Sequence, residues 1–334
     1  MTSPTASNWT LTERLAGYGG YNGAHSIRFA NRVVQEFHPD TPLGDPTETT
    51  YALRCDYDDD HNTIDILDQL LEHAEPGAIE SLVFGLWGNS EGVCTGDESS
   101  KLVVDGLIAR TDRLPNLKAV FIGDITYEEC EISWLVQSDM SPLLQAYPKL
   151  ELLQVRGGDR LAFENPGTHN HLNALIIETG GLSRDTVHQI YQWKFPALNH
   201  LELWFGSEDY GGNCWDRDLP PILDGLCFPR LDYLGLRNSK FADEMIDRLV
   251  RSPLLERLRV LDLSMGTLGD DGAAKLLNCR AIAELDTLNV SENYLSESMV
   301  EQLRSLNITV IADEQREEED DEDPAYRRYC VVSE

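Results

Sequence analysis

A short apolar pattern recurs along the chain at intervals of 22 to 38 residues. Its clearest copy runs from Leu285 to Leu295 and fits L-x-x-L-x-L-x-x-N-x-L, with Val290 as the one aliphatic exchange. Segments that begin at Leu258 and Leu231 open in the same way. In the eight copies, the third apolar position falls at Phe84, Ile122, Val155, Ile177, Leu203, Leu236, Leu263 and Val290. Steps near 27 residues are typical of repeats that return through a full helix.

Helical spacing of apolar residues follows several of these copies. It predicts helices over residues 183–191, 242–251, 271–277 and 297–306. One strand with one helix behind it cannot bury its own apolar face, so neighbouring units must stack. The sequence therefore predicts an α/β leucine-rich repeat solenoid (horseshoe) of about eight repeats, with a parallel concave β-sheet and convex helices.

The position that holds a ladder asparagine in such repeats is asparagine in only one copy, at Asn293. The other copies carry small residues there, namely Gly158, Gly180, Gly206, Ser239 and Gly266. We therefore expect other groups or water to satisfy the backbone at those turns.

The repeats leave two atypical ends. Residues 1–78 are predicted to form an N-terminal cap, with a strand over 51–57 and a helix over 64–74, ahead of a repeat domain over 79–312. Residues 313–334 are predicted to be a disordered acidic tail with a terminal motif that includes Arg328, Tyr329, Ser333 and Glu334. That motif could fold back as a strand on the last repeat or serve as a linear motif for a partner or a modifying enzyme.

Long steps between copies indicate insertions over residues 87–99, 124–140 and 205–219. Each follows a predicted strand, so all three are expected on one rim, where insertions in solenoids often bind partners. The candidate binding residues are Tyr127, Glu128, Glu129, Glu131, Asp209 and Tyr210. The alternative is structural: Ile132, Trp134 and Trp215 would cover the edge of the core.

Strand alternation places other side chains on the concave face. In the middle of the predicted sheet these are Arg156, Glu178, His200, Glu202, Trp204, Tyr233 and Arg237. In one interpretation they bind an acidic group or a peptide of a partner, with Trp204 as the anchor. In the other, Arg156 and Arg237 pair with carboxylates on neighbouring strands.

The charge of the chain narrows the classes of partner. It has 58 acidic and 27 basic residues, a formal net charge of −31. Such a surface repels phosphate backbones, so a protein or peptide partner, and a basic one in particular, is expected rather than nucleic acid. No apolar run is long enough for a membrane span, and the first 20 residues lack a secretory pattern. Seven scattered cysteines without a C-x-x-C pair predict reduced thiols, and the chain is expected to be a cytoplasmic monomer.

The sequence offers no catalytic motif. Residues 17–23 are glycine-rich but lack dinucleotide or phosphate-loop spacing. Residues 56–61 resemble a calcium loop only in charge. The cluster of Glu128, Glu129 and Glu131 is better interpreted as a solvated loop than as a metal site. We therefore expect no enzyme activity, no metal and no cofactor.

Several segments resemble a bacterial leucine-rich repeat family of uncharacterised function with ribonuclease-inhibitor-like repeats. The resemblance rests on residues 122–134, 155–159, 177–182, 202–204, 208–212, 235–239 and 328–334, and covers most of residues 50–334. The family's tail usually reads Arg-Tyr-Val-Ala-Val-Ser-Glu, from which Cys330 and Val331 depart. The resemblance implies genes beside radical-SAM and ATP-grasp type enzymes, and so a substrate, scaffold or partner in such a pathway.

These observations favour a non-enzymatic scaffold that binds a protein or peptide through its concave face, rim loops and tail. Two alternatives remain open. One is a regulator of a basic protein, of the inhibitor or GTPase-activator type, whose binding would depend steeply on salt. The other is a substrate whose C-terminus is modified by ATP-grasp or radical-SAM type enzymes.

Overall fold

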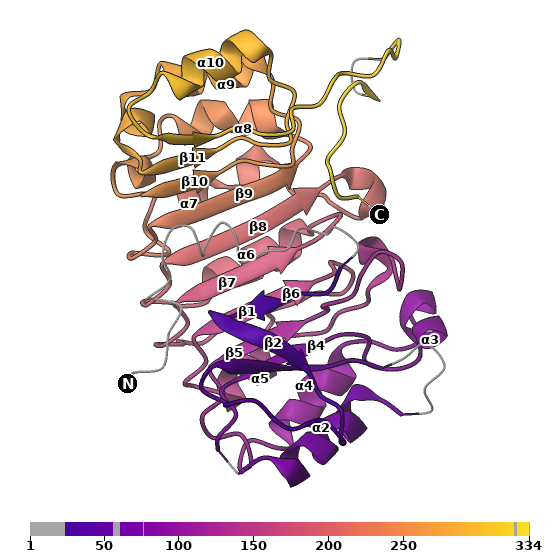
Figure 1. The fold of residues 1–334 in the computed structure, drawn as a ribbon. Coiled ribbons are helices and arrows are strands. Elements are labelled where there is room, and N and C mark those ends of the chain that lie inside the picture. Colours follow the sequence, from indigo (N-terminus) through magenta and orange to yellow (C-terminus); the bar gives the residue numbers. More distant parts are fainter. Residues whose placement is uncertain (1–23, 56–60, 76, 324–325, 334) are drawn as a thin grey trace. The chain divides into compact units, whose positions relative to one another are not determined.

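The computed structural model describes residues 24–55, 61–75, 77–323 and 326–333 (Figure 1). Contacts between residues divide the chain into two compact units. Among the described residues, unit 1 comprises those up to Ile177 together with 192–197, and unit 2 comprises those in 178–191 and 198–333. These units do not follow the predicted division into cap, repeats and tail, because the tail belongs to unit 2. Both units are stacks of strands and helices, and the fold is an α/β leucine-rich repeat solenoid.

The strands of unit 1 follow chain order and are parallel, apart from an antiparallel hairpin at the start. They are β1 (Arg28–Phe29), β2 (Arg32–Glu36), β3 (Thr49–Leu53), β4 (Ser81–Phe84), β5 (Ala119–Ile122), β6 (Leu152–Arg156) and β7 (Ala174–Glu178). The helices of this unit are α2 (Thr63–His73), α3 (Ser90–Thr95), α4 (Lys101–Ile108) and α5 (Ser141–Ala146). Among them α2 packs on α4, and α4 packs on α5.

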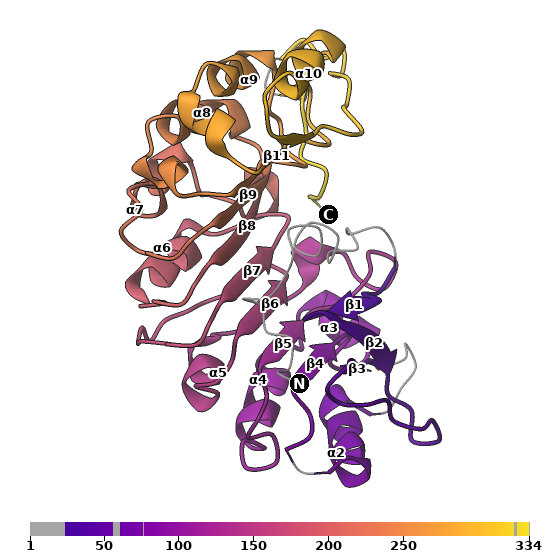
Figure 2. The same ribbon diagram turned by 60° about the vertical axis from the view of Figure 1, so that its left-hand side comes forward.

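Unit 2 repeats the same arrangement. Its strands are parallel and lie side by side in Figure 1: β8 (His200–Gly206), β9 (Tyr233–Ser239), β10 (Val260–Asp262), β11 (Thr287–Asn289) and β12 (Thr309–Ile311). The helices are α6 (Arg184–Gln192), α7 (Pro220–Leu223), α8 (Ala242–Leu249), α9 (Asp270–Leu277) and α10 (Glu297–Arg304). Helices α8, α9 and α10 pack in succession on one side of the strands (Figure 2).

The observed strand register confirms the predicted repeats. Ile122 pairs with Phe84 and with Val155, and Leu203 pairs with Leu236, so the third apolar positions align from repeat to repeat. The predicted helices are also confirmed, with ends that differ by at most two residues. Apolar side chains from these positions are buried because each unit of the stack covers its neighbour.

Asn293 makes the ladder contacts expected of it. Its side-chain amide donates to the carbonyl oxygens of Leu263 and Val290, at 2.9 and 3.1 Å, and its Oδ1 accepts from the amide of Leu268 at 3.0 Å. One buried side chain thereby joins two neighbouring repeats at the point where their chains turn away from the sheet.

The predicted N-terminal cap contains more of the sheet than expected. Strand β3 pairs in parallel with both β2 and β4, so the stack begins before the first recognised repeat. The β1–β2 hairpin turns through Ala30 and Asn31, which have positive φ values of 50° and 61°. We call the sheet face opposite the helices the inner face. Phe29 packs on this inner face, with its ring centroid 5.8 Å from that of Phe121.

The inner face of unit 1 is therefore covered by the protein's own hairpin. The buried residues that Phe29 and Ala30 join come from five successive strands: Ala52, Val83, Ala119, Phe121, Leu152 and Ala174. Alanine at three of these six positions leaves room for the hairpin to approach. This part of the inner face is an internal apolar core rather than an open binding surface.

Candidate functional site

The C-terminal tail packs on unit 2, along the edge where the strands end. In Figure 1 it is the yellow segment that passes the arrowheads of β8 and β9. Residues 326–333 form no strand, but Cys330 and Val332 are only 5% and 3% exposed. The predicted free tail is therefore wrong, and so is the alternative of a strand on the last repeat. The tail instead crosses the strand ends of several repeats.

Side chains of unit 2 bind the main chain of the tail. Oδ1 of Asn238 accepts from the amide of Val332 at 3.0 Å, and the Asn238 amide group donates to the Val332 carbonyl. The hydroxyl of Tyr294 accepts from the amide of Tyr329 at 2.9 Å, and the amide of Val331 donates to the carbonyl of Met265 at 3.0 Å. Contacts of this kind recognise an extended backbone.

Arg328 is the charged anchor of the tail. Its Nη1 lies 2.9 Å from Oδ2 of Asp243, at the start of α8, and 3.1 Å from the Thr267 carbonyl. Its Nη2 lies 2.6 Å from Oε1 of Glu318, which belongs to the tail itself. Burial opposes the charge of the guanidinium, but hydrogen bonding to Glu318 and the charge of Asp243 outweigh it and raise the pKa of Arg328. The pair is stronger than a surface ion pair because it is partly withdrawn from water.

Two glycines leave the space that the tail occupies. A Cβ on Gly180 would lie 2.3 Å from the carbonyl oxygen of Ser333, and a Cβ on Gly269 would lie 2.2 Å from Nη1 of Arg328. A side chain at Gly180 would collide with the main chain of the tail, and one at Gly269 would displace the Arg328 guanidinium. We call the residues that meet the tail, namely Gly180, Gly206, Asn238, Lys240, Asp243, Met265, Thr267, Gly269 and Tyr294, the tail-binding edge.

A cavity of about 480 Å³ opens beside the docked tail. Its walls include the aromatic side chains of Phe205, Trp215 and Phe241, and its lining also contains Glu208, Asp209, Glu244 and Tyr326. The predicted insertion over 205–219 forms one side of it. Of the predicted rim residues of unit 2, Asp209 lines this cavity, and Tyr210 lies in the adjoining 3₁₀ turn, Glu208–Tyr210.

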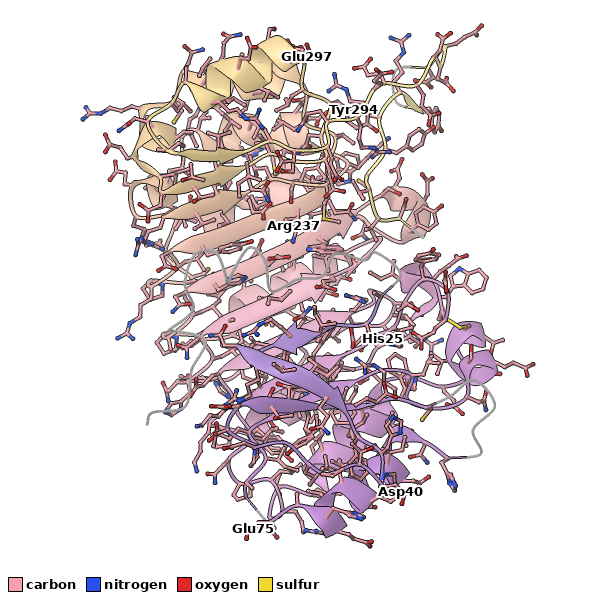
Figure 3. The ribbon with its side chains drawn as sticks, in the orientation of Figure 1. His25, Asp40, Glu75, Arg237, Tyr294 and Glu297 are labelled. Atoms are coloured by element: carbon pink, nitrogen blue, oxygen red, sulfur yellow. A yellow bond between two sulfur atoms is a disulfide. The ribbon has the colours of Figure 1, made fainter. Side chains whose placement is uncertain are left out.

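A second cluster lies on the inner face of unit 2 and is centred on Glu202. Its carboxylate is 2.8 Å from Nη1 of Arg237 and accepts from Trp204 Nε1 at 2.7 Å and from the Tyr233 hydroxyl at 3.1 Å. Gly235 pairs with both Glu202 and Asp262, so these two carboxylates flank the same position. Arg237, labelled in Figure 3, contacts both carboxylates, with its Nε 3.6 Å from Asp262.

The structure brings five of the seven predicted concave residues into this cluster: His200, Glu202, Trp204, Tyr233 and Arg237. Arg237 pairs with carboxylates of neighbouring strands, as the structural interpretation predicted. Trp204 is 1% exposed, so the expectation of a solvent-facing aromatic anchor is wrong. Arg156 is buried elsewhere, where it donates to the Ile125 carbonyl at 3.0 Å, and Glu178 is buried at the end of β7. A binding role for these residues stays a prediction.

The ionised form of Glu202 is strongly favoured. Burial alone would raise its pKa, but the charge of Arg237 and the His200 ring, whose Nε2 lies 3.6 Å from the carboxylate, outweigh this and lower the pKa from 4.5 to about 2. The same arrangement, with the charges of Glu202 and Asp262 acting against burial, raises the pKa of Arg237.

This pKa gives a testable dependence of stability on pH. A carboxyl group with a lowered pKa in the folded state stabilises the fold above its unfolded pKa, and this contribution is lost as the pH falls. For Glu202 the loss should therefore begin below about pH 4.5 and continue toward pH 2. We expect the melting temperature of the wild type to fall more steeply below pH 4.5 than that of Glu202→Gln. Parallel curves from circular dichroism between pH 7 and pH 3 would contradict the assignment.

The rim loops of unit 1 converge around Glu129. Its Oε2 lies 2.8 Å from Nε2 of His25 and accepts from the amide and hydroxyl of Thr126 (Figure 3 labels His25). Burial opposes ionisation, but hydrogen bonds from His25 and Thr126 outweigh it and lower the pKa of Glu129. Glu129 is thus a structural anchor of the loop. Tyr127 and Glu128 are exposed, and Glu131 is half-buried. Their binding role stays a prediction.

Two of the predicted reduced thiols are joined. Cys94 and Cys130 form a disulfide, with their Cα atoms 5.7 Å apart. The prediction was wrong because the two insertions leave the adjacent strands β4 and β5 at the same edge, which brings together residues 36 apart in sequence. The structural alternative for the insertions was that three apolar side chains cover the edge of the core. Ile132 is buried and Trp215 lines the cavity, but Trp134 is 54% exposed and does not cover the core.

Some predictions lie outside the described residues, namely those on residues 17–23, 56–60 and Glu334. Within the described part of the chain, no three His, Cys, Asp or Glu side chains are grouped as metal ligands would be. No helix in the described residues is long and apolar enough to cross a membrane.

Comparison with known proteins adds the following. No protein-family model and no curated protein matches the chain. A crystal structure of a Bacteroides fragilis protein matches with a TM-score of 0.76 and 28% identity, over 85% of this chain and 77% of that one. Two internalins of Listeria monocytogenes, InlF and InlP, match with TM-scores of 0.36 and 0.35, at 13% and 15% identity. They cover 73% and 76% of this chain and 69% of each of those chains, and values this low support no conclusion about function. The chain is thus similar over most of its length to a bacterial protein of known structure.

Proposed function

We propose that the protein is a non-enzymatic scaffold that binds an extended segment of a partner protein. Recognition takes place at the tail-binding edge of unit 2, next to the rim loop over 205–219. The observation that carries this proposal is the docked tail: unit 2 holds an extended peptide through side-chain bonds to its backbone, with Asn238 bonded to both the amide and the carbonyl of Val332. A surface that holds one peptide in this way is suited to another.

Charge favours a basic partner. Glu208, Asp209 and Glu244 line the cavity beside the tail and are exposed. The whole chain carries a formal net charge of −31, which attracts basic segments at long range. A partner with basic residues would therefore associate quickly and in a salt-dependent manner. Attraction of a basic partner is common to the scaffold proposal and to the alternative of a regulator of a basic protein.

Photo-crosslinking can test the proposal. We would place benzoylphenylalanine at Asp209, beside the cavity, and at Arg280 as the control, whose side chain is 94% exposed in the 3₁₀ turn Arg280–Glu284. In cells of the native host, we expect one dominant protein adduct from position 209, absent from position 280. Adducts of equal yield at both positions, or none at 209, would refute a binding role for this edge.

A further inference from the structure

We infer that the partner segment reproduces the pattern of the tail. It presents a long basic residue at the position that corresponds to Tyr326, and an arginine at the position of Arg328. A small apolar side chain follows two positions after the arginine, and an aliphatic side chain four positions after it. The inference deepens the proposed function and rests on it. It makes the tail an internal competitor, which occupies the tail-binding edge until a segment of the same pattern replaces it.

The spacing of this pattern follows from burial along the tail. Cys330 and Val332 are 5% and 3% exposed, whereas Val331 between them is 37% exposed. This alternation is what an extended chain gives when one side faces a surface. Arg328 precedes Cys330 by the same step of two and points to Asp243 on the same surface. The edge therefore buries every second side chain. Of the residues between, Val331 is exposed and the Tyr329 ring lies 4.9 Å from Nζ of Lys240.

The first of these positions is specific for arginine. The guanidinium meets a carboxylate of Asp243, the carbonyl of Thr267 and the ring of Tyr294, whose centroid lies 5.7 Å away. A planar group with several donors can satisfy all three, whereas a lysine ammonium presents a point charge on a flexible stem. The second position is limited in size, because the Cys330 thiol lies 3.6 Å from the Gly206 carbonyl.

A tethered tail has an advantage over any free segment. A ligand on the same chain acts at an effective concentration on the order of millimolar, so a competitor needs contacts that the tail does not make. The cavity of about 480 Å³ supplies them. Tyr326 lines it but is 51% exposed, so it leaves the cavity largely unfilled.

The chemistry of the cavity selects a long basic side chain. Its methylenes would pack on Phe205, Trp215 and Phe241 and its charged end would face the exposed carboxylates of Glu208, Asp209 and Glu244. Ser207 also lines the cavity, and its buried hydroxyl has no hydrogen-bond partner among the described residues. A group from outside would satisfy it.

Matched variants of the full-length chain test this inference. Val332→Asp places a charge at a buried position and should release the tail, whereas Val331→Asp makes the same change at its exposed neighbour. Both alter only the tail, so the repeats stay intact. Trypsin should cleave after Arg328 much faster in the Val332→Asp chain, which verifies release. A fluorescent peptide of residues 326–333 should then bind this chain at least tenfold more tightly than the Val331→Asp chain.

Peptide variants test the pattern itself. Arg328→Lys or Val332→Asp in the peptide should each weaken binding to the released chain by about tenfold or more, and Val331→Asp should not. Tyr326→Lys should strengthen binding several-fold and make it more salt-dependent. In the protein, Asp243→Asn should weaken binding, whereas Asp271→Asn on the exposed side of α9 should not. Equal binding of the Arg328→Lys and wild-type peptides, or no binding to the released chain, would overturn the inference.

The two proposals can fail separately. If position 209 yields a partner adduct that an excess of the peptide does not reduce, the scaffold stands and the shared pattern is refuted. If the peptide binds the released chain as expected but no partner adduct forms, the edge is a latch for its own tail and the scaffold is refuted. Loss of the adduct on addition of the peptide, but not of the Arg328→Lys peptide, supports both.

Discussion

Replacing Glu202 with alanine should lower the free energy of unfolding by about 3–5 kcal/mol. The carboxylate is 0% exposed and accepts hydrogen bonds from Arg237, Trp204 and Tyr233. Its removal takes away the carboxylate that lies 2.8 Å from a nearly buried guanidinium, whose Nε is 3.6 Å from Asp262. An uncompensated buried charge costs far more than the loss of one exposed ion pair.

Urea unfolding followed by circular dichroism would measure this loss. The control is Glu301→Ala, which removes an exposed carboxylate from α10 in the same unit and should change stability by less than about 0.5 kcal/mol. The double variant Glu202→Leu/Arg237→Met should recover part of the loss, because it removes both charges. A loss below about 1 kcal/mol for Glu202→Ala would show that the pair is hydrated and not the buried anchor described above.

Replacing Phe29 with alanine should lower the free energy of unfolding by about 3–5 kcal/mol. Phe29 is 5% exposed and fills the inner face of unit 1 over residues from five strands. The alanine would leave a cavity against Phe121 that the rigid strands beneath cannot close. The measurement is again urea unfolding, with binding of a hydrophobic dye as a second readout of the uncovered face.

Ile27→Ala is the matched control. Ile27 lies two residues earlier, is 78% exposed and loses a comparable side chain, so its removal should be nearly neutral. Equal effects of the two substitutions would contradict the assignment of the hairpin as a cover. An effect confined to Phe29 means that this inner face is closed to partners as long as the hairpin is in place.

Three features of the inner faces and the edge underlie the proposed site of recognition. In unit 1 the inner face is covered by the hairpin, and in unit 2 the ionised groups of the inner face satisfy one another. The strand-end edge of unit 2 is where a peptide is held. We therefore propose recognition at the strand-end edge of unit 2 rather than across the sheet.

The sequence by itself determined the fold class, the register of the repeats and most helices. These follow from local periodicity: each strand has apolar residues at fixed offsets, and each helix has them at steps of three and four. Leu203 and Leu236 pair in the sheet because identical units stack in register. The role of Asn293 was also predictable, since its position in the repeat sets its hydrogen bonds. The pairing of Arg237 with neighbouring carboxylates followed from strand alternation.

Only the tertiary structure decided what covers these faces and edges. Asn238 and Val332 are 94 residues apart, and no periodicity relates them. The acidic composition of residues 313–323 predicted disorder because a charged segment buries little apolar surface by itself. The tail is nevertheless anchored by the guanidinium of Arg328 and by the small apolar side chains of Cys330 and Val332. The partners of these side chains lie in other repeats. Stacking is local and repeats along the sequence, whereas docking of an end depends on single contacts between distant segments, which composition does not encode.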